Sequence, residues 1–250
     1  MIVLRSLVFT LFLYLSIALV GLLLVPTLFM SRRTSMRAIK VWARLVVWAV
    51  RAICGVRVEV RGLQHRPAGA ALVAAKHQGM LDVIAPFTFL DDPCFVMKKE
   101  LMALPIFGWH AWKSGMIPVD RAKAAVALKK MVADVRDRLN ETRQILIFPE
   151  GTRTEPGAAG DYKPGVAALY RELDTPCALI ATNSGVCWPA HGFIRRPGTV
   201  VFEFLEPVPA GLKRAQFMAE MHARIEAASL ALLSPLPQGE GGVRAAGVGG

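Results

Sequence analysis

The chain has 250 residues, enough for one sizeable domain with an appendage. Hydrophobic residues make up 54% of the chain and the mean hydropathy is +0.40, which argues against an ordinary soluble protein. The net charge of +11 suits nucleic acid, an anionic membrane or acidic small ligands. Because basic residues stand beside an apolar N-terminal segment, the composition favours the membrane and not nucleic acid.

The N-terminal segment has the composition of a retained membrane anchor. Residues 6–30 carry no charged side chain, and Arg32 and Arg33 follow them. This length suffices to cross the hydrocarbon core or to enter it and return, and no small-residue cleavage site marks a secretory signal. Pro26 should kink or end the helix. The positive charge after the anchor predicts a location at the cell inner membrane, with the remaining chain on the cytoplasmic face.

A second helix, over residues 36–54, is expected to be amphipathic. Its basic side chains fall within about 60° of one another around the helix axis; they are Arg37, Lys40, Arg44 and Arg51. Such a helix lies in the interface of an anionic leaflet, and the alternative is a helix packed on the domain with a solvated basic face. Together the two helices form a predicted membrane-associated hairpin over residues 1–55.

Strands and helices alternate over residues 56–233, which predicts an α/β domain whose mixed, mainly parallel sheet is covered by helices. The predicted strands are residues 56–61, 71–75, 94–97, 116–119, 144–147, 176–182 and 199–204. The predicted helices are residues 80–90, 121–140, 163–171 and 214–233. Residues 98–115 are expected to be irregular, and the Pro- and Gly-rich residues 234–250 to form a disordered tail.

The cysteines are widely spaced and are predicted to be reduced, small apolar residues in a reducing compartment. They are Cys54, Cys94, Cys177 and Cys187. Cys187 and His191 are close in the chain, but no second ligand pair accompanies them, so we expect no metal site.

His77 stands at the end of a predicted strand, and Asp82 follows across a turn into a helix. This turn brings the carboxylate back to one imidazole nitrogen, so that the other nitrogen faces outward as a base that activates a hydroxyl. The alternative is a hydrogen-bonded structural histidine. If the strand continues, the neighbouring Lys76 should point to the face opposite His77.

Residues 148–153, Phe-Pro-Glu-Gly-Thr-Arg, follow the buried strand 144–147. Ligands in open α/β sheets bind at this end of the strands. Gly151 lets the backbone approach a ligand, Arg153 suits a phosphate or carboxylate, and Glu150 positions that side chain or a substrate hydroxyl. A turn with one surface ion pair is the alternative.

The two motifs as a pair, behind an apolar and basic N-terminus, resemble the glycerolipid acyltransferase family, in particular its 1-acylglycerol-3-phosphate acyltransferases. The resemblance covers residues 56–212, and residues 115–121 and the strand before Asn183 are similar to two further blocks of the family. It implies transfer of a fatty acyl group from acyl-CoA or acyl carrier protein to the free hydroxyl of lysophosphatidate. The product would be phosphatidate, formed without a cofactor or metal at a membrane of anionic lipid.

Carried over residue by residue, the resemblance implies that His77 is the general base and Asp82 orients it. It also implies an acceptor site made of Glu150, Gly151, Thr152, Arg153 and Arg121. The chain departs from the family at Lys76 and Gly79, where Asn or Ser and Ser or Thr are usual. These departures leave other acceptors open, such as another lysophospholipid or an acylated amino-acid lipid. A hydrolase and a non-enzymatic protein that binds anionic lipid are the alternatives outside this chemistry.

Overall fold

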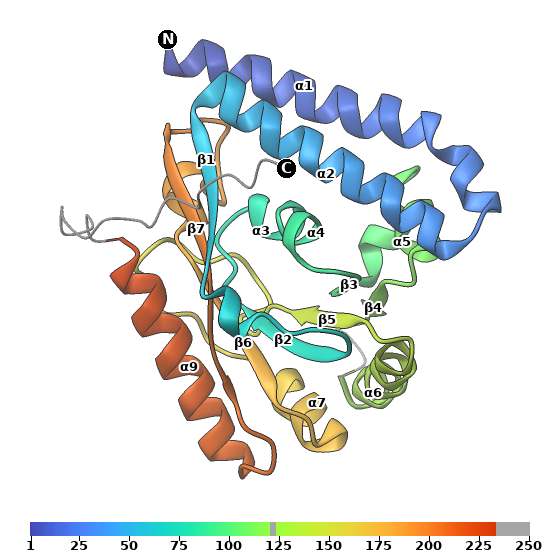
Figure 1. The fold of residues 1–250 in the computed structure, drawn as a ribbon, viewed down its shortest axis with the longest axis vertical. Helices are drawn as coiled ribbons and strands as arrows, with labels where there is room; N and C mark the ends of the chain where they lie inside the picture. Colours follow the sequence, from blue (N-terminus) through green and yellow to red (C-terminus); the bar gives the residue numbers. More distant parts are fainter. Residues whose placement is uncertain (121–123, 234–250) are drawn as a thin grey trace, which may run out of the picture.

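A seven-stranded sheet runs through the centre of the computed structural model, with helices on both faces (Figure 1). The structure describes residues 1–120 and 124–233. The strands are β1 (Val56–Arg61), β2 (Ala71–Ala75), β3 (Pro93–Lys98), β4 (Ile117–Val119), β5 (Gln144–Ile147), β6 (Cys177–Thr182) and β7 (Gly198–Val208). The helices are α1 (Ile2–Leu23), α2 (Arg32–Cys54), α3 (Leu81–Ile84), α4 (Pro86–Phe89), α5 (Phe107–Lys113), α6 (Ala124–Asn140), α7 (Gly165–Leu173), α8 (Ser184–Cys187) and α9 (Arg214–Ala231). Short 3-10 segments are η1 (Val25–Phe29), η2 (Leu63–His65) and η3 (Lys99–Ala103).

The sheet has the order β1-β7-β6-β2-β5-β3-β4, and its neighbouring strands are parallel except for the antiparallel pair β6–β7. The predicted mixed, mainly parallel sheet is therefore confirmed. Strand β2 lies between β5 and β6 and runs parallel to both. The carboxyl ends of these three strands consequently meet at one edge, which is where ligands bind in open α/β sheets.

The side chains of β2 alternate between two hydrophobic layers. Val73 and Ala75 belong to the layer under α2, α3 and α4, whereas Leu72 and Ala74 belong to the layer under α6, α7 and α9. The main chain of Lys76 continues the ladder, since its N–H donates to the carbonyl of Ile180 at 2.9 Å. This period-two alternation sends Lys76 toward α9 and His77 toward the opposite layer, as predicted.

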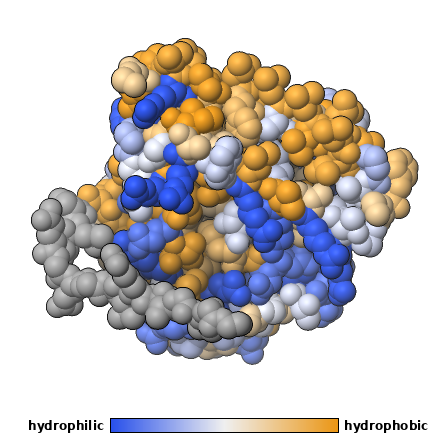
Figure 2. Space-filling view, turned by 45° about the horizontal axis from the view of Figure 1, so that its top comes forward, coloured by the Kyte–Doolittle hydropathy of each residue, from blue (hydrophilic) through white to orange (hydrophobic). Residues whose placement is uncertain are grey.

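Helices α1 and α2 form an antiparallel hairpin against one side of the sheet (Figure 1). α1 ends at Leu23, shortly before Pro26, as the sequence predicted. Within the described ranges, α1 is the one helix that is long and apolar enough to cross a membrane, and only 22% of its most apolar stretch is buried. Figure 2 shows apolar side chains gathered over the side of the molecule where this hairpin lies.

The apolar face of α2 packs on the protein, which is the arrangement given above as the alternative to a helix whose apolar face meets lipid. Val46 and Val50 are fully buried in the layer that covers the sheet. Lys40 also leaves the predicted basic face, because its ammonium donates to the carbonyls of Leu90 and Asp91 at 2.8 and 2.9 Å. The outer face of α2 instead mixes cationic and apolar exposed side chains, among them Arg37, Val41, Arg44, Leu45, Trp48 and Arg51.

Residues 98–115 were expected to be irregular but contain η3 and α5. Tertiary contacts explain this helix. Nε2 of His110 lies 2.9 Å from the carbonyl oxygen of Gly21 in α1, and Gly108 lies so close to the carbonyl of Met102 that a Cβ there would collide with it. The predicted start of the helix 121–140 and the predicted tail 234–250 lie outside the described residues.

Candidate active site

The carboxylate of Asp82 closes the turn that carries His77. Its Oδ2 atom lies 3.2 Å from Nδ1 of His77 and accepts the backbone N–H groups of Gln78 and Gly79 at 2.6 and 2.7 Å. Asp82 is buried, whereas the His77 side chain keeps 14% exposure. One oxygen atom thus fixes both the turn and the ring. Among the described residues, Nε2 of His77 has no hydrogen-bond partner, so this nitrogen is available to a substrate.

The segment after β5 contacts His77 through one stacked ring and two hydrogen bonds. The ring of Phe148 stacks on the imidazole, with centroids 4.0 Å apart and planes 17° apart. The carboxylate of Glu150 accepts a hydrogen bond from the backbone N–H of His77 at 2.8 Å. The backbone N–H of Thr154 donates to the carbonyl of His77, also at 2.8 Å. Residues 151–153 lie between these two anchors, so chain connectivity holds them close to His77. The structure therefore brings the two predicted motifs together.

The predicted role of Glu150 in touching the acceptor needs revision. Its side chain is 1% exposed, and its Oε1 atom lies 2.8 Å from the ammonium of Lys76 and accepts the Thr154 hydroxyl at 3.0 Å. Burial raises the pKa of the Glu150 carboxyl, and Lys76 opposes this rise by favouring the charged form. A carboxylate this enclosed supports the motif from inside the protein and presents almost no surface to a ligand.

Gly151, Thr152 and Arg153 form the outer part of the same loop. Gly151 has a φ of 69°, a left-handed conformation that glycine adopts without a steric penalty. Thr152 and Arg153 are exposed. One N–H of the Arg153 guanidinium donates to the carbonyl of Ala190 at 3.2 Å. The predicted acceptor residue Arg121 lies outside the described residues.

The loop that contains Ala190 also reaches the N-terminal helix, which sequence reasoning missed. Trp188 is buried at the start of this loop, and its ring meets the edge of Phe9 in α1 with centroids 5.1 Å apart. The backbone N–H of Arg195 donates to the hydroxyl of Ser6 at 2.8 Å. The carbonyl of Trp188 lies so close to Gly79 that a Cβ there would be 2.4 Å from it. The loop that contains Trp188 thus lies between α1 and the turn that carries His77, and it contacts both.

Lys76 is the second feature that the sequence did not explain. Its side chain is 1% exposed and points to the face opposite His77, where it contacts Glu150 and both carboxylate oxygens of Glu226 in α9. The sequence predicted the direction of Lys76 from the strand alternation. It gave no sign of Glu226, which lies far away in the chain.

Comparison with known proteins identifies what this arrangement is similar to. A family model described as Acyltransferase matches residues 57–182. The 1-acyl-sn-glycerol-3-phosphate acyltransferase of Pseudomonas aeruginosa is 32% identical over 200 residues, which cover 79% of this chain and 78% of that protein. The alpha form of the same enzyme from Mus musculus is 31% identical over 143 residues, 56% of this chain and 50% of that protein. The crystal structure of a 1-acyl-sn-glycerophosphate acyltransferase from Thermotoga maritima matches with a TM-score of 0.77 and 19% identity over 95% of this chain and 98% of that chain, which shows a shared fold.

Proposed function

This chain belongs to the acyltransferase family, and we propose that it transfers a fatty acyl group from acyl-CoA or acyl carrier protein to the free hydroxyl of 1-acylglycerol-3-phosphate, giving phosphatidate. The observation that carries this proposal is the His77–Asp82 pair, in which Nδ1 of the imidazole lies 3.2 Å from the carboxylate while the His77 side chain keeps 14% exposure. A relative 32% identical over most of both chains is a 1-acyl-sn-glycerol-3-phosphate acyltransferase, which supports this acceptor. The thioester is already activated, so the proposed reaction uses no cofactor or metal.

His77 acts as the general base in the proposed mechanism. Nε2 takes the proton from the acceptor hydroxyl while its oxygen attacks the carbonyl carbon of the thioester. Asp82 keeps Nδ1 facing its carboxylate and stabilises the imidazolium that forms. The tetrahedral intermediate then collapses, the carbon–sulfur bond breaks, and the imidazolium returns the proton to the departing sulfur. The products are an ester and a free thiol.

The acceptor's phosphate is proposed to bind at the outer loop after β5. A phosphomonoester carries nearly two negative charges, and an Arg guanidinium binds such a group with two parallel hydrogen bonds. Arg153 is exposed and lies one residue from Thr154, which is bonded to His77. Gly151 and Thr152 supply close backbone and hydroxyl contacts, and Arg121 adds a second positive group. This arrangement would hold the acceptor hydroxyl near Nε2 of His77.

The proposed location is a membrane of anionic lipid, the cell inner membrane, with the catalytic domain on its cytoplasmic face. The exposed apolar surface of α1 supports membrane contact, and the cationic residues on the outer face of α2 suit acidic headgroups. One face of α1 is buried against α2 and the loop near Arg195, while α2 packs on the sheet. This packing supports a hairpin that enters one leaflet, because a crossing would draw the domain into the bilayer.

The proposal is tested with purified, detergent-solubilised protein. The donor is palmitoyl-CoA or palmitoyl-acyl carrier protein, and the acceptors are lysophosphatidate, lysophosphatidylethanolamine, lysophosphatidylglycerol and an acylated amino-acid lipid. We expect phosphatidate from lysophosphatidate at a kcat/KM at least about tenfold above that of the other acceptors, since they lack the phosphomonoester that the Arg153 loop is proposed to bind. A faster reaction with another acceptor would contradict the assignment of lysophosphatidate while leaving the acyl transfer intact.

A further inference from the structure

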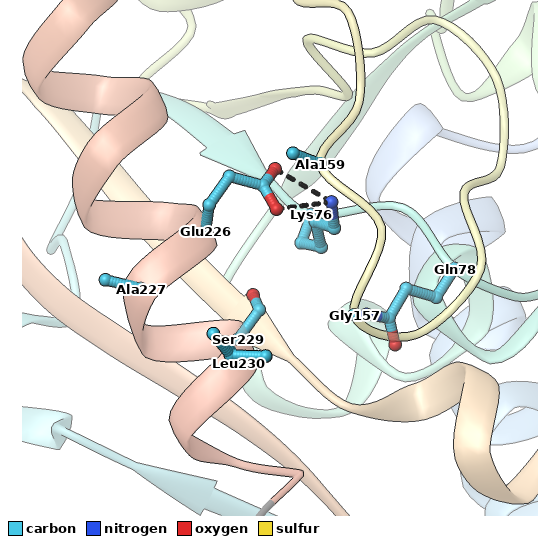
Figure 3. A pocket seen from close by; sticks show the side chains of 8 residues that line it. All are labelled: Lys76, Gln78, Gly157, Ala159, Glu226, Ala227, Ser229 and Leu230. Carbon is cyan, nitrogen blue, oxygen red and sulfur yellow. Dashed lines mark hydrogen bonds and ion pairs between the residues drawn. The ribbon is translucent and has the colours of Figure 1, made fainter.

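Lys76 lies at the centre of a buried cluster of charges, and Figure 3 shows its ammonium facing the carboxylate of Glu226. Its ammonium lies 2.8 Å from Oε1 of Glu150 and 2.8 Å from each carboxylate oxygen of Glu226, and it donates to the carbonyl of Ala158 at 3.0 Å. Glu226 also accepts the hydroxyl of Tyr162 at 2.9 Å. The cluster thus ties β2, the loop after β5 and the C-terminal helix α9 to one nitrogen atom.

Buried ion pairs are costly, because the free energy lost when an ammonium and a carboxylate leave water can exceed the free energy gained from their attraction. Lys76 and Glu150 are each 1% exposed. Glu226 keeps 17% exposure and borders a cavity of about 160 Å³ between α9 and the loop of Gly157 and Ala159. An apolar residue at position 76 would extend the packing of Leu72 and Ala74 without that cost. Packing of the hydrophobic layer therefore does not account for the buried charges.

The contacts of Glu150 connect the buried cluster to His77. One carboxylate oxygen is taken by Lys76 and Thr154, and the other accepts the backbone N–H of His77. Lys76 directly precedes His77 in the chain, so the contacts of its side chain also fix the peptide bond between the two residues. Without Lys76, Glu150 and Glu226 would be two carboxylates in one enclosed space, and one of them would hold a proton. A protonated Glu150 would have to donate its O–H to a partner, and the hydrogen bonds that it accepts from His77 and Thr154 would change.

We propose that Lys76 and Glu226 are positioning residues, which hold the Glu150 carboxylate against the backbone of His77 and so fix the catalytic base for proton transfer. This inference rests on the proposed function. It assigns a role in catalysis to α9, a helix that carries no predicted site residue. The lysine at position 76 is matched in this chain by an acid at position 226.

Two graded variants and a matched control test this role in the full-length, detergent-solubilised protein. Lys76→Met removes the cation and keeps a side chain of similar length. Glu226→Gln keeps the shape of its residue, removes the charge, and replaces one of the two oxygens that accept from Lys76 with an NH2 group that cannot accept. Glu220→Gln removes the same charge from the same helix, at a position whose side chain is 40% exposed and pairs with Arg224. Each variant is compared with the unaltered protein in thermal unfolding, in kcat, in KM for lysophosphatidate, and in kcat against pH.

The expected result is a loss in kcat with little change in KM, because the acceptor is proposed to bind at the Arg153 loop and not at the cluster. A base misplaced by less than 1 Å loses up to about a hundredfold in rate, so we expect kcat to fall about tenfold to a hundredfold in Lys76→Met and about threefold to tenfold in Glu226→Gln. Glu220→Gln should have the same kcat, the same KM and the same pH profile as the unaltered protein. The pair of carboxylates left in Lys76→Met binds a proton up to a higher pH, so the acid limb of its pH profile should move upward. The titratable side chains around Glu150 in this cluster are those of Lys76, Glu226 and Tyr162, whereas His77 meets Glu150 through its backbone N–H.

A folded Lys76→Met or Glu226→Gln protein with unaltered kcat and pH profile would overturn the positioning role. A raised KM at unchanged kcat would overturn it as well, since it would move the cluster to acceptor binding. If Lys76→Met does not fold, Glu226→Gln decides alone, because glutamine has the size of the glutamate that it replaces and this position borders the cavity. An inactive unaltered protein would contradict the proposed acceptor or donor, which separates that failure from a failure of this inference.

Discussion

Replacement of Gly79 by serine should damage this enzyme, although serine or threonine is usual at this position in the family that the sequence resembles. A Cβ atom at position 79 would lie 2.4 Å from the carbonyl oxygen of Trp188, whereas real Cβ contacts are essentially never below 3.0 Å. The two backbone segments would therefore have to separate by at least about 0.6 Å, and overpacking of this kind costs about 1–3 kcal/mol. The unfolding midpoint should fall by about 2–12 °C, at about 2–4 °C per kcal/mol for a chain of this size.

The same shift should reduce activity, because the Gly79 N–H donates at 2.7 Å to the Asp82 oxygen that faces His77. We expect kcat to fall about tenfold or more. Thermal unfolding in detergent and a phosphatidate assay measure the two effects. Gly165→Ala is the matched control, since its Cβ would meet only the methyl end of Met131 at 3.5 Å, an ordinary contact. A Gly79→Ser protein with unaltered unfolding midpoint and kcat would refute the reasoning.

Three further predictions follow from the site and its surroundings. Arg153→Ala should raise KM for lysophosphatidate about tenfold to a hundredfold, as expected for the loss of a hydrogen bond to a charged group; an unchanged KM in steady-state kinetics would remove Arg153 from the acceptor site. Burial raises the pKa of Cys94 to about 11 and of Cys177 to about 12, so both thiols stay protonated at pH 8. Ellman's reagent should therefore label neither cysteine until the protein is denatured, and labelling of either one in the native protein would contradict their burial. Phe9→Ala should cost about 3–5 kcal/mol and lower activity even in detergent, because Phe9 supports Trp188; activity and unfolding midpoint equal to the unaltered protein would limit α1 to membrane attachment.

The sequence was sufficient for the sheet and for the meeting of the two motifs. Strands such as residues 71–75 and 144–147 are short apolar runs with turn residues after them, so their type is a local property. Parallel strands then bring their carboxyl ends to one edge, which places the residues after β2 and β5 together without further information. The turn from His77 to Asp82 is equally local, and the structure has the carboxylate facing the ring.

Features that depend on distant contacts were not accessible in this way. Helix α5 has no strong periodicity and is held by contacts such as that between His110 and Gly21. The apolar face of α2 is the same pattern whether it meets lipid or protein, and only the fold shows that Val46 and Val50 meet protein. The partnership of Lys76 and Glu226 joins residues from β2 and α9, and no local pattern records it.

The role of Glu150 shows the same limit within the site. Its place in the motif predicted a contact with the substrate, because a polar residue after a buried strand usually faces a ligand. The structure turns this carboxylate inward, where Lys76 and the backbone of His77 occupy it. Residue type and position in the chain identified the site, but the direction of each side chain came from the packing around it.

The most direct test of the account is phosphatidate formation by the unaltered protein beside His77→Ala, with lysophosphatidate and a long-chain acyl-CoA. Loss of a general base lowers the rate by about a hundredfold to ten-thousandfold. We predict phosphatidate from the unaltered protein, a loss of this size in His77→Ala, and thermal unfolding of the variant within a few degrees of the unaltered protein. Phosphatidate formation by His77→Ala at the unaltered rate would contradict the assignment of His77 as the base.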